Sequence, residues 1–184
     1  MIDQSALSLS RENRRTVVGV VGFAVAMAAA SQIAIPIPGT AVPMTLSPLA
    51  AILAGLWLGP RAGAASMVLY LAAGAAGLPV FAPMGAPGVL RLIGPTGGYL
   101  LAFPIAAFAA GAVARVRPSF IGRVCAAALG MVLIHTGGIA QLTILTGSVT
   151  SAIIAGSLPF LAMDLVKAVI AGVLSRGRMD GARA

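Results

Sequence analysis

Long apolar runs, separated by glycine- and proline-rich segments, make up most of this chain of 184 residues. The first run, residues 16–35, has the roughly 20 residues that a helix needs to cross a hydrocarbon core about 30 Å thick. The same pattern predicts five further helices, over residues 45–58, 62–78, 97–114 and 124–145 and from a polar turn at 146–150 to residue 174. We therefore expect an all-α integral membrane protein, a six-transmembrane-helix bundle that forms one domain over residues 1–184.

Two of the segments between these helices are long and unusually apolar. Residues 36–43 contain three prolines and no charge, and residues 79–96 contain four prolines with Arg91 as the one charged residue. Proline interrupts a regular helix, and a plain solvated loop would be more polar. We expect both segments to be long apolar loops on the outer side, folded over the protein at membrane depth. In the last helix, Pro159 predicts a kink.

The composition agrees with a lipid environment. Hydrophobic residues make up 59% of the chain and charged residues 9%, whereas soluble domains have about 25% charged residues. The net charge of +8 does not indicate nucleic-acid binding, because the basic residues flank apolar runs and form no basic-aromatic surface. The single cysteine, Cys125, excludes an internal disulfide.

The distribution of basic residues predicts the orientation in the membrane. With the N-terminus inside, ten of the twelve Lys and Arg residues fall in cytoplasmic segments, and Arg91 is the one in an outer loop. The positive-inside rule then places residues 1–15 and the tail, residues 175–184, in the cytoplasm. We expect a multi-pass protein of the plasma (inner) membrane.

Asp164 and Lys167 stand inside an apolar helix, where each charge costs about 2.5–3.5 kcal/mol on insertion scales. They are three residues apart and therefore share one face of the helix. Two interpretations remain open. The two residues form either an ion pair that fastens the helices together or a polar ligand site inside the bundle.

Other polar residues are weaker candidates. Arg91 is either an exposed loop arginine or a clamp for a carboxylate, which a guanidinium can bind through two hydrogen bonds. Gln141 suits an interhelical hydrogen bond, and Tyr99 belongs either to the membrane interface or to a pocket wall. His135, the only histidine, has no carboxylate near it in the sequence. We interpret it as a packed or helix-bonding residue and expect no metal site.

No pattern in the sequence is typical of an enzyme. A Gly-Lys-Ser/Thr phosphate loop is missing, so this chain cannot hydrolyse ATP by that route. No Ser-His-Asp pattern and no His/Glu metal cluster occurs. We expect no enzyme activity and no cofactor.

Several motifs resemble those of the BioY family, in consistent order over residues 17–174. They are QIAIPIPGTAVPMTL (32–46), LWLGPRAG (56–63), GLPVF (77–81), GPTGGYL (94–100) and DLVK (164–167). Two departures occur: Trp57 stands where an aliphatic residue is expected, and Ser47-Pro48 replaces the usual Gln-Thr. The second departure lies near the expected pocket, so Ser47 and Pro48 are left out of the candidate site.

Members of this family are the substrate-capture (S) components of energy-coupling factor (ECF) transporters for biotin. The resemblance implies six helices and a biotin pocket that opens to the outside. It implies two kinds of partner, a transmembrane T component and a pair of cytoplasmic ABC-type ATPases that alone use ATP. It also implies that the small residues Ala24 and Ala28 of the first helix dock on the T component.

The resemblance and the polar residues together give a candidate substrate site. Its members are Asp164, Lys167, Arg91, Thr45, Tyr99 and Gln141. Asp164 would accept hydrogen bonds from the ureido N–H groups of biotin, and Arg91 or Lys167 would pair with its carboxylate.

Two other functions remain open. A stand-alone proton-coupled or facilitative vitamin carrier would use Asp164 as its proton site. An intramembrane enzyme that acts on lipid would use His135 and Asp164, and the sequence does not show whether these two residues meet. A second copy of the chain is a further candidate partner.

Overall fold

The computed structural model describes residues 4–176, with side chains from residue 13 onward. Helices and one two-stranded ribbon are the regular elements of this part of the chain, which confirms the all-α part of the predicted fold class. Its helices are α1 (Gln4–Gln32), α2 (Ser47–Leu58), α3 (Pro60–Ala75), α4 (Leu90–Ile93), α5 (Gly97–Val116), α6 (Phe120–Thr146), α7 (Val149–Gly156) and α8 (Leu161–Leu174).

The first helix and the first loop differ from the prediction. Helix α1 begins at Gln4, so most of the expected polar lead-in of residues 1–15 is helical. It ends at Gln32, and the chain then forms β1 (Ala34–Ile35), which pairs antiparallel with β2 (Met44–Thr45). The prolines of residues 36–43 keep the tip of this ribbon non-helical, as predicted. The ribbon was not predicted, because two-residue strands leave no alternating pattern.

The predicted count of six crossings is not confirmed by helix length. Within residues 4–176, three helical stretches are long and apolar enough to cross a membrane: Asn13–Gln32, Gly97–Val116 and Phe120–Thr146. Helices α7 and α8 form a fourth candidate if they count as one span bent by 57°, which places a break where the Pro159 kink was predicted. Helices α2 and α3 have 12 and 16 residues, too few for a full crossing without tilt or help from neighbouring segments. The protein is a multi-pass membrane protein whose crossing number stays a prediction.

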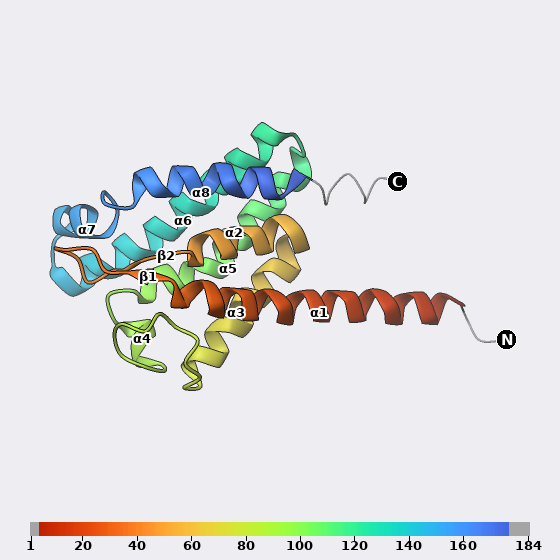
Figure 1. Cartoon of the computed structure of the whole chain (residues 1–184), viewed down its shortest axis with the longest axis horizontal. Coiled ribbons are helices and arrows are strands. Elements are labelled where there is room, and N and C mark those ends of the chain that lie inside the picture. Colours follow the sequence, from red (N-terminus) through yellow and green to blue (C-terminus); the bar gives the residue numbers. More distant parts are fainter. Residues whose placement is uncertain (1–3, 177–184) are drawn as a thin grey trace.

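The two ends of the bundle differ in charge. The start of α1, the α2–α3 and α5–α6 junctions and the end of α8 lie at one end, and the ribbon, α4 and α7 lie at the other (Figure 1). The junctions at the first end contain Arg61, Arg115, Arg117 and Arg123, whereas the opposite end contains Arg91 in α4. The basic segments of the predicted cytoplasmic side therefore share one end. Arg178 and Arg183 lie outside the described residues.

Small residues allow the central helices to approach closely. A Cβ on Gly55 of α2 would overlap the carbonyl of Ala107 in α5, and one on Gly98 of α5 would overlap the carbonyl of Gly137 in α6. Helix α5 therefore packs directly on both α2 and α6. Such contacts stabilise helix association in lipid through van der Waals packing.

Candidate functional site

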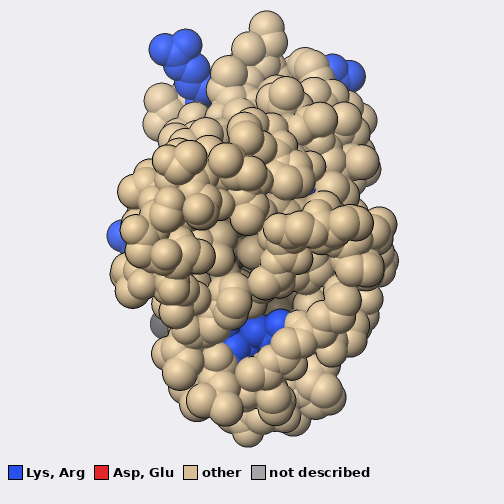
Figure 2. Space-filling view, turned by 90° about the vertical axis from the view of Figure 1, so that its left-hand side faces the viewer, with Lys and Arg blue, Asp and Glu red and all other residues tan. Residues whose placement is uncertain are grey.

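A cavity opens among the loops at the ribbon end of the bundle. The space free of protein atoms is about 660 Å³, including the part open to solvent. Figure 2 looks onto this end, where a hollow shows Lys or Arg atoms at its floor and no Asp or Glu is visible. The polar residues that line the cavity are Ser31, Thr45, Ser47, Tyr70, Arg91, Thr96, Tyr99, His135, Asp164 and Lys167.

The charged pair of α8 faces this cavity. Lys167 Nζ donates to Asp164 Oδ1 at 2.8 Å, and the two residues are 4% and 6% exposed. They share a face because they are three residues apart on one helix. The opposite face of α8 carries exposed Leu165 and Val169, as expected next to lipid. The ion pair of the first interpretation exists and also borders a cavity, whereas the ligand site of the second interpretation stays a prediction.

His135 joins this pair from the middle of α6. Its Nε2 lies 2.7 Å from Asp164 Oδ2, and its ring is near those of Tyr99 and Phe160, with centroid distances of 6.2 and 6.3 Å. His135 is therefore a packed residue that also bonds between helices, as predicted, and its partner is Asp164. The sequence gives no signal for this contact, because His135 and Asp164 are 29 residues apart on different helices.

Arg91 is buried, so its interpretation as an exposed loop residue was wrong. It is 6% exposed and lines the cavity. Its Nη2 donates to the carbonyl of Ala82 at 2.5 Å, and its Nη1 donates to the carbonyl of Met84. Burial lowers the pKa of Arg91, an effect that nearby Tyr70 opposes. Gly85 has φ +111, and a Cβ there would overlap the guanidinium, so the loop can wrap around Arg91 only with glycine at this position.

Glutamines from two helices fasten the loop that contains Arg91. Gln141 Nε2 of α6 donates to the carbonyls of Leu92 and Gly94 at 3.0 and 2.6 Å. Gln32 Nε2 of α1 donates to the carbonyl of Phe81 at 3.0 Å. Gln141 does not line the cavity, although the sequence placed it among the candidate ligand residues. It holds the α3–α5 loop instead.

Three hydroxyl groups form a second polar cluster in the cavity wall. Ser31 Oγ donates to the carbonyl of Met27 at 2.9 Å and contacts Ser47 Oγ at 3.0 Å and Tyr70 Oη at 2.7 Å. Ser31 has one hydroxyl proton, so all three bonds form together only if Ser47 and Tyr70 donate to it. Ser47 and Pro48, which were not among the candidate site residues, both line the cavity.

Two further candidates from the sequence, Thr45 and Tyr99, do line the cavity. Thr45 Oγ1 accepts a hydrogen bond from the backbone N–H of Ser47 at 3.3 Å and thereby helps to start α2. Tyr99 Oη donates to the carbonyl of Gly156 at 2.5 Å, which fixes the ring of Tyr99 against α7. Their side chains are therefore held in place at the cavity wall.

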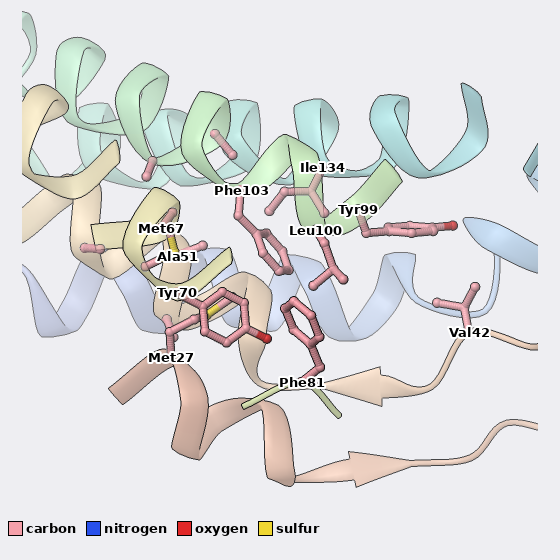
Figure 3. Close-up of a cluster of buried hydrophobic side chains, with 14 of the residues drawn as sticks. Met27, Val42, Ala51, Met67, Tyr70, Phe81, Tyr99, Leu100, Phe103 and Ile134 are labelled. Carbon is pink, nitrogen blue, oxygen red and sulfur yellow. The ribbon is translucent and has the colours of Figure 1, made fainter. Parts of the chain in front are cut away.

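The rest of the wall is apolar. Figure 3 shows Phe81, Leu100 and Phe103 converging beside Tyr70, and Tyr70 and Phe81 make an edge-to-face contact with ring centroids 5.4 Å apart. Such a wall suits a hydrophobic ring or chain, while the few charged groups fix its orientation. Among the described residues, no group of three or more His, Cys, Asp or Glu side chains is arranged to hold a metal ion.

The two alanines expected to dock on a partner face inward. Ala24 is 8% exposed in the core, and Ala28 packs partly buried against the same cluster. The exposed small residues of α1 include Gly22, which has nothing within 4 Å of the place of a Cβ, and Ala26. Both line a shallow groove between α1 and α2 that includes Trp57.

Comparisons with known proteins agree with these features. Over 140 residues, the chain is 40% identical to a protein named "Probable biotin transporter BioY" from Pyrococcus horikoshii, which covers 76% of this chain and 82% of that protein. It is 36% identical over 141 residues to "Biotin transporter BioY" from Thermotoga maritima, covering 77% and 83% of the two chains.

The fold also has a counterpart among solved structures. The crystal structure of an "S-component for biotin from an ECF-type ABC transporter" superposes with a TM-score of 0.83 at 24% identity, covering 90% of this chain and 91% of that one. The sequence profile described as "BioY family" matches residues 4–182, nearly the full length. By its sequence, from the N-terminal helix to the C-terminal tail, this chain belongs to the BioY family.

Proposed function

We propose that this protein binds biotin at the outer face of the plasma membrane and takes part in its uptake as the substrate-capture component of an ECF transporter. The observation that carries the proposal is the cavity, which combines Asp164, Lys167, His135 and Arg91 with an apolar wall. The names of the relatives from Pyrococcus horikoshii and Thermotoga maritima support it, as does the fold shared with a biotin S component.

The charges of the cavity favour Arg91 as the partner of the biotin carboxylate. Asp164 and Lys167 already neutralise each other at 2.8 Å. Arg91 contacts backbone carbonyls but makes no ion pair with a carboxylate within the described part of the chain. A buried charge is stabilised by an opposite charge, so a bound carboxylate compensates Arg91 best. Lys167 then stays with Asp164.

The opposite end of biotin suits the group around Asp164. An ionised carboxylate has about four acceptor positions, of which Lys167 and His135 occupy two. The ureido N–H groups of biotin can use the others. Between the two ends, the rings of biotin lie against Phe81, Phe103 and neighbouring apolar residues.

ATP-driven uptake would require partner subunits, because this chain contains no phosphate loop. In the proposed complex, cytoplasmic ATPases supply the energy and the T component contacts the protein from within the membrane. The groove with Gly22 and Ala26 on α1 is the proposed place for a T-component helix, since small residues let helices approach closely. In this orientation the start of α1 and the end of α8, which lie at the end away from the cavity, face the cytoplasm.

The proposal is tested by biotin titration calorimetry on the purified protein. The wild type should bind biotin. Asp164→Asn should raise the dissociation constant at least tenfold, because a charge-assisted hydrogen bond contributes about 1.5–3 kcal/mol. Met163→Leu is the matched control: Met163 is the adjacent residue but is 45% exposed on the lipid side. A wild-type protein that does not bind biotin would contradict the proposal.

One contact supports the alternative of an enzyme that acts on lipid, namely the contact between His135 and Asp164. An acyl-transfer site would also need a nucleophile hydrogen-bonded to the histidine. His135 Nδ1 has no partner within residues 13–176, and Nε2 is bonded to Asp164. The contact therefore fits a binding site better than a catalytic one.

A further inference from the structure

One buried residue of the cavity, His135, has been assigned no contact with the ligand. His135 lies in the middle of α6, is 9% exposed and borders the cavity. Its single side-chain hydrogen bond within the described residues is the one to Asp164 Oδ2.

The hydrogen-bond pattern fixes which nitrogen of the ring carries the proton. The carboxylate of Asp164 is an acceptor, since it already accepts from Lys167, so Nε2 of a neutral His135 carries the hydrogen and donates it. Nδ1 is then an acceptor, and no protein group bonds to it within the described part of the chain.

This pattern does not suit a residue kept for stability alone. An apolar residue of similar size would fill the same space without a ring nitrogen that no protein group within the described residues bonds to. The ring also contacts the rings of Tyr99 and Phe160, and its hydrogen bond directs it toward Asp164. Both features point to a role that depends on Asp164.

The bond to His135 determines how the Asp164 carboxylate lies. Lys167 comes from the same helix as Asp164, so it can follow the carboxylate when that group rotates. His135 comes from a different helix, α6, and its Nε2 lies 2.7 Å from the second oxygen, Oδ2. This bond fixes the carboxylate relative to α6. Together the two donors fix the plane of the carboxylate and leave its remaining acceptor positions for a ligand.

We propose that His135 is a positioning residue of the binding site, which orients the Asp164 carboxylate so that it accepts the N–H groups of the ligand. The inference rests on the proposed function and names the ureido ring as the part of biotin whose binding depends on His135. Holding an acceptor in advance reduces the ordering needed on binding, and so strengthens it.

Three substitutions at one position test this role by biotin titration. His135→Gln keeps an N–H donor near the place of Nε2, His135→Asn keeps one near Nδ1 instead, and His135→Leu keeps none. We expect the Leu and Asn variants to bind biotin about tenfold or more weakly, and the Gln variant to remain within about threefold of wild type. Thr136→Ala is the control on the same helix, because Thr136 is exposed and bonds only to its own helix.

A double-mutant cycle separates positioning from simple packing. If His135 acts through Asp164, adding His135→Leu to Asp164→Asn should weaken binding no further than about twofold. Effects that multiply, or equal losses in the Gln, Asn and Leu variants, would overturn the inference. Should the Leu variant fail to fold, the Gln and Asn variants still decide. A wild-type protein that binds no biotin contradicts the proposed function, whereas biotin binding with a multiplicative cycle contradicts only the role of His135.

Discussion

Replacing Arg91 by methionine and measuring two ligands distinguishes two roles of this residue. Its guanidinium holds the α3–α5 loop through the carbonyls of Ala82 and Met84, and it is the proposed partner of the biotin carboxylate. Methionine fills a similar volume without a charge or a donor. The loss of biotin affinity in Arg91→Met therefore has an electrostatic part and a part that comes from the loop.

The size of the electrostatic part follows from the contacts. A hydrogen bond between charged groups contributes about 1.5–3 kcal/mol, which corresponds to roughly 10- to 150-fold in the dissociation constant. Arg91 has no competing carboxylate in the described part of the chain, so this contribution is not shared with a protein ion pair. The same substitution should scarcely affect the affinity for biotinamide through this term, because biotinamide has no negative charge.

The assay is titration calorimetry with biotin and with biotinamide, for the wild type, Arg91→Met and Gln141→Leu. Gln141→Leu is the control for the loop, since Gln141 bonds to Leu92 and Gly94 of the same loop without lining the cavity. It should change both affinities by the same factor, whereas Arg91→Met should reduce biotin binding at least tenfold more than biotinamide binding. Equal losses for both ligands in Arg91→Met would refute the assignment of the carboxylate.

Two other predictions concern orientation and partners. In a Cys125→Ser background, Ala86→Cys in the α3–α5 loop should react with a membrane-impermeant maleimide in intact cells, and Arg117→Cys only after permeabilisation; the reverse pattern would refute cytoplasmic termini. Ala26→Leu should leave biotin binding unchanged and reduce ATP-driven uptake in vesicles that contain the partner subunits, because it fills the exposed groove. Unimpaired uptake with Ala26→Leu, or uptake without any ATPase, would contradict the role as an ECF component. Ala24→Leu should instead lower the unfolding temperature in detergent, since Ala24 is 8% exposed in the core.

Most helices could be predicted because apolar runs and proline breaks act locally along the chain. The junction at Gly59, with φ +83, and the break near Pro159 lie where glycine and proline indicated them. The first helix was predicted to begin at residue 16, because the residues before it are too polar for a membrane span. Helix α1 nevertheless begins at Gln4, since that segment contains no glycine or proline to stop a helix. The β1–β2 ribbon depends on a pairing that its short sequence does not signal.

The candidate site was only partly predictable, for a similar reason. Asp164, Lys167 and Arg91 stand out because charges are rare in apolar surroundings. Ser31 and His135 do not, because their roles arise from contacts between helices that are distant in the sequence. Gln141 was recognised as polar, but only the fold shows that it reaches a loop and not the cavity.

Retention of a ligand through purification shows whether the cavity of this protein binds biotin. The measurement is mass spectrometry of the small molecules released from the protein after purification in biotin-containing medium, with the Asp164→Asn, Arg91→Met double variant purified in parallel. We expect about one molecule of biotin per chain in the wild-type sample and little biotin in the sample of the double variant. A different small molecule in the wild type, or equal amounts of biotin in both samples, would contradict this expectation.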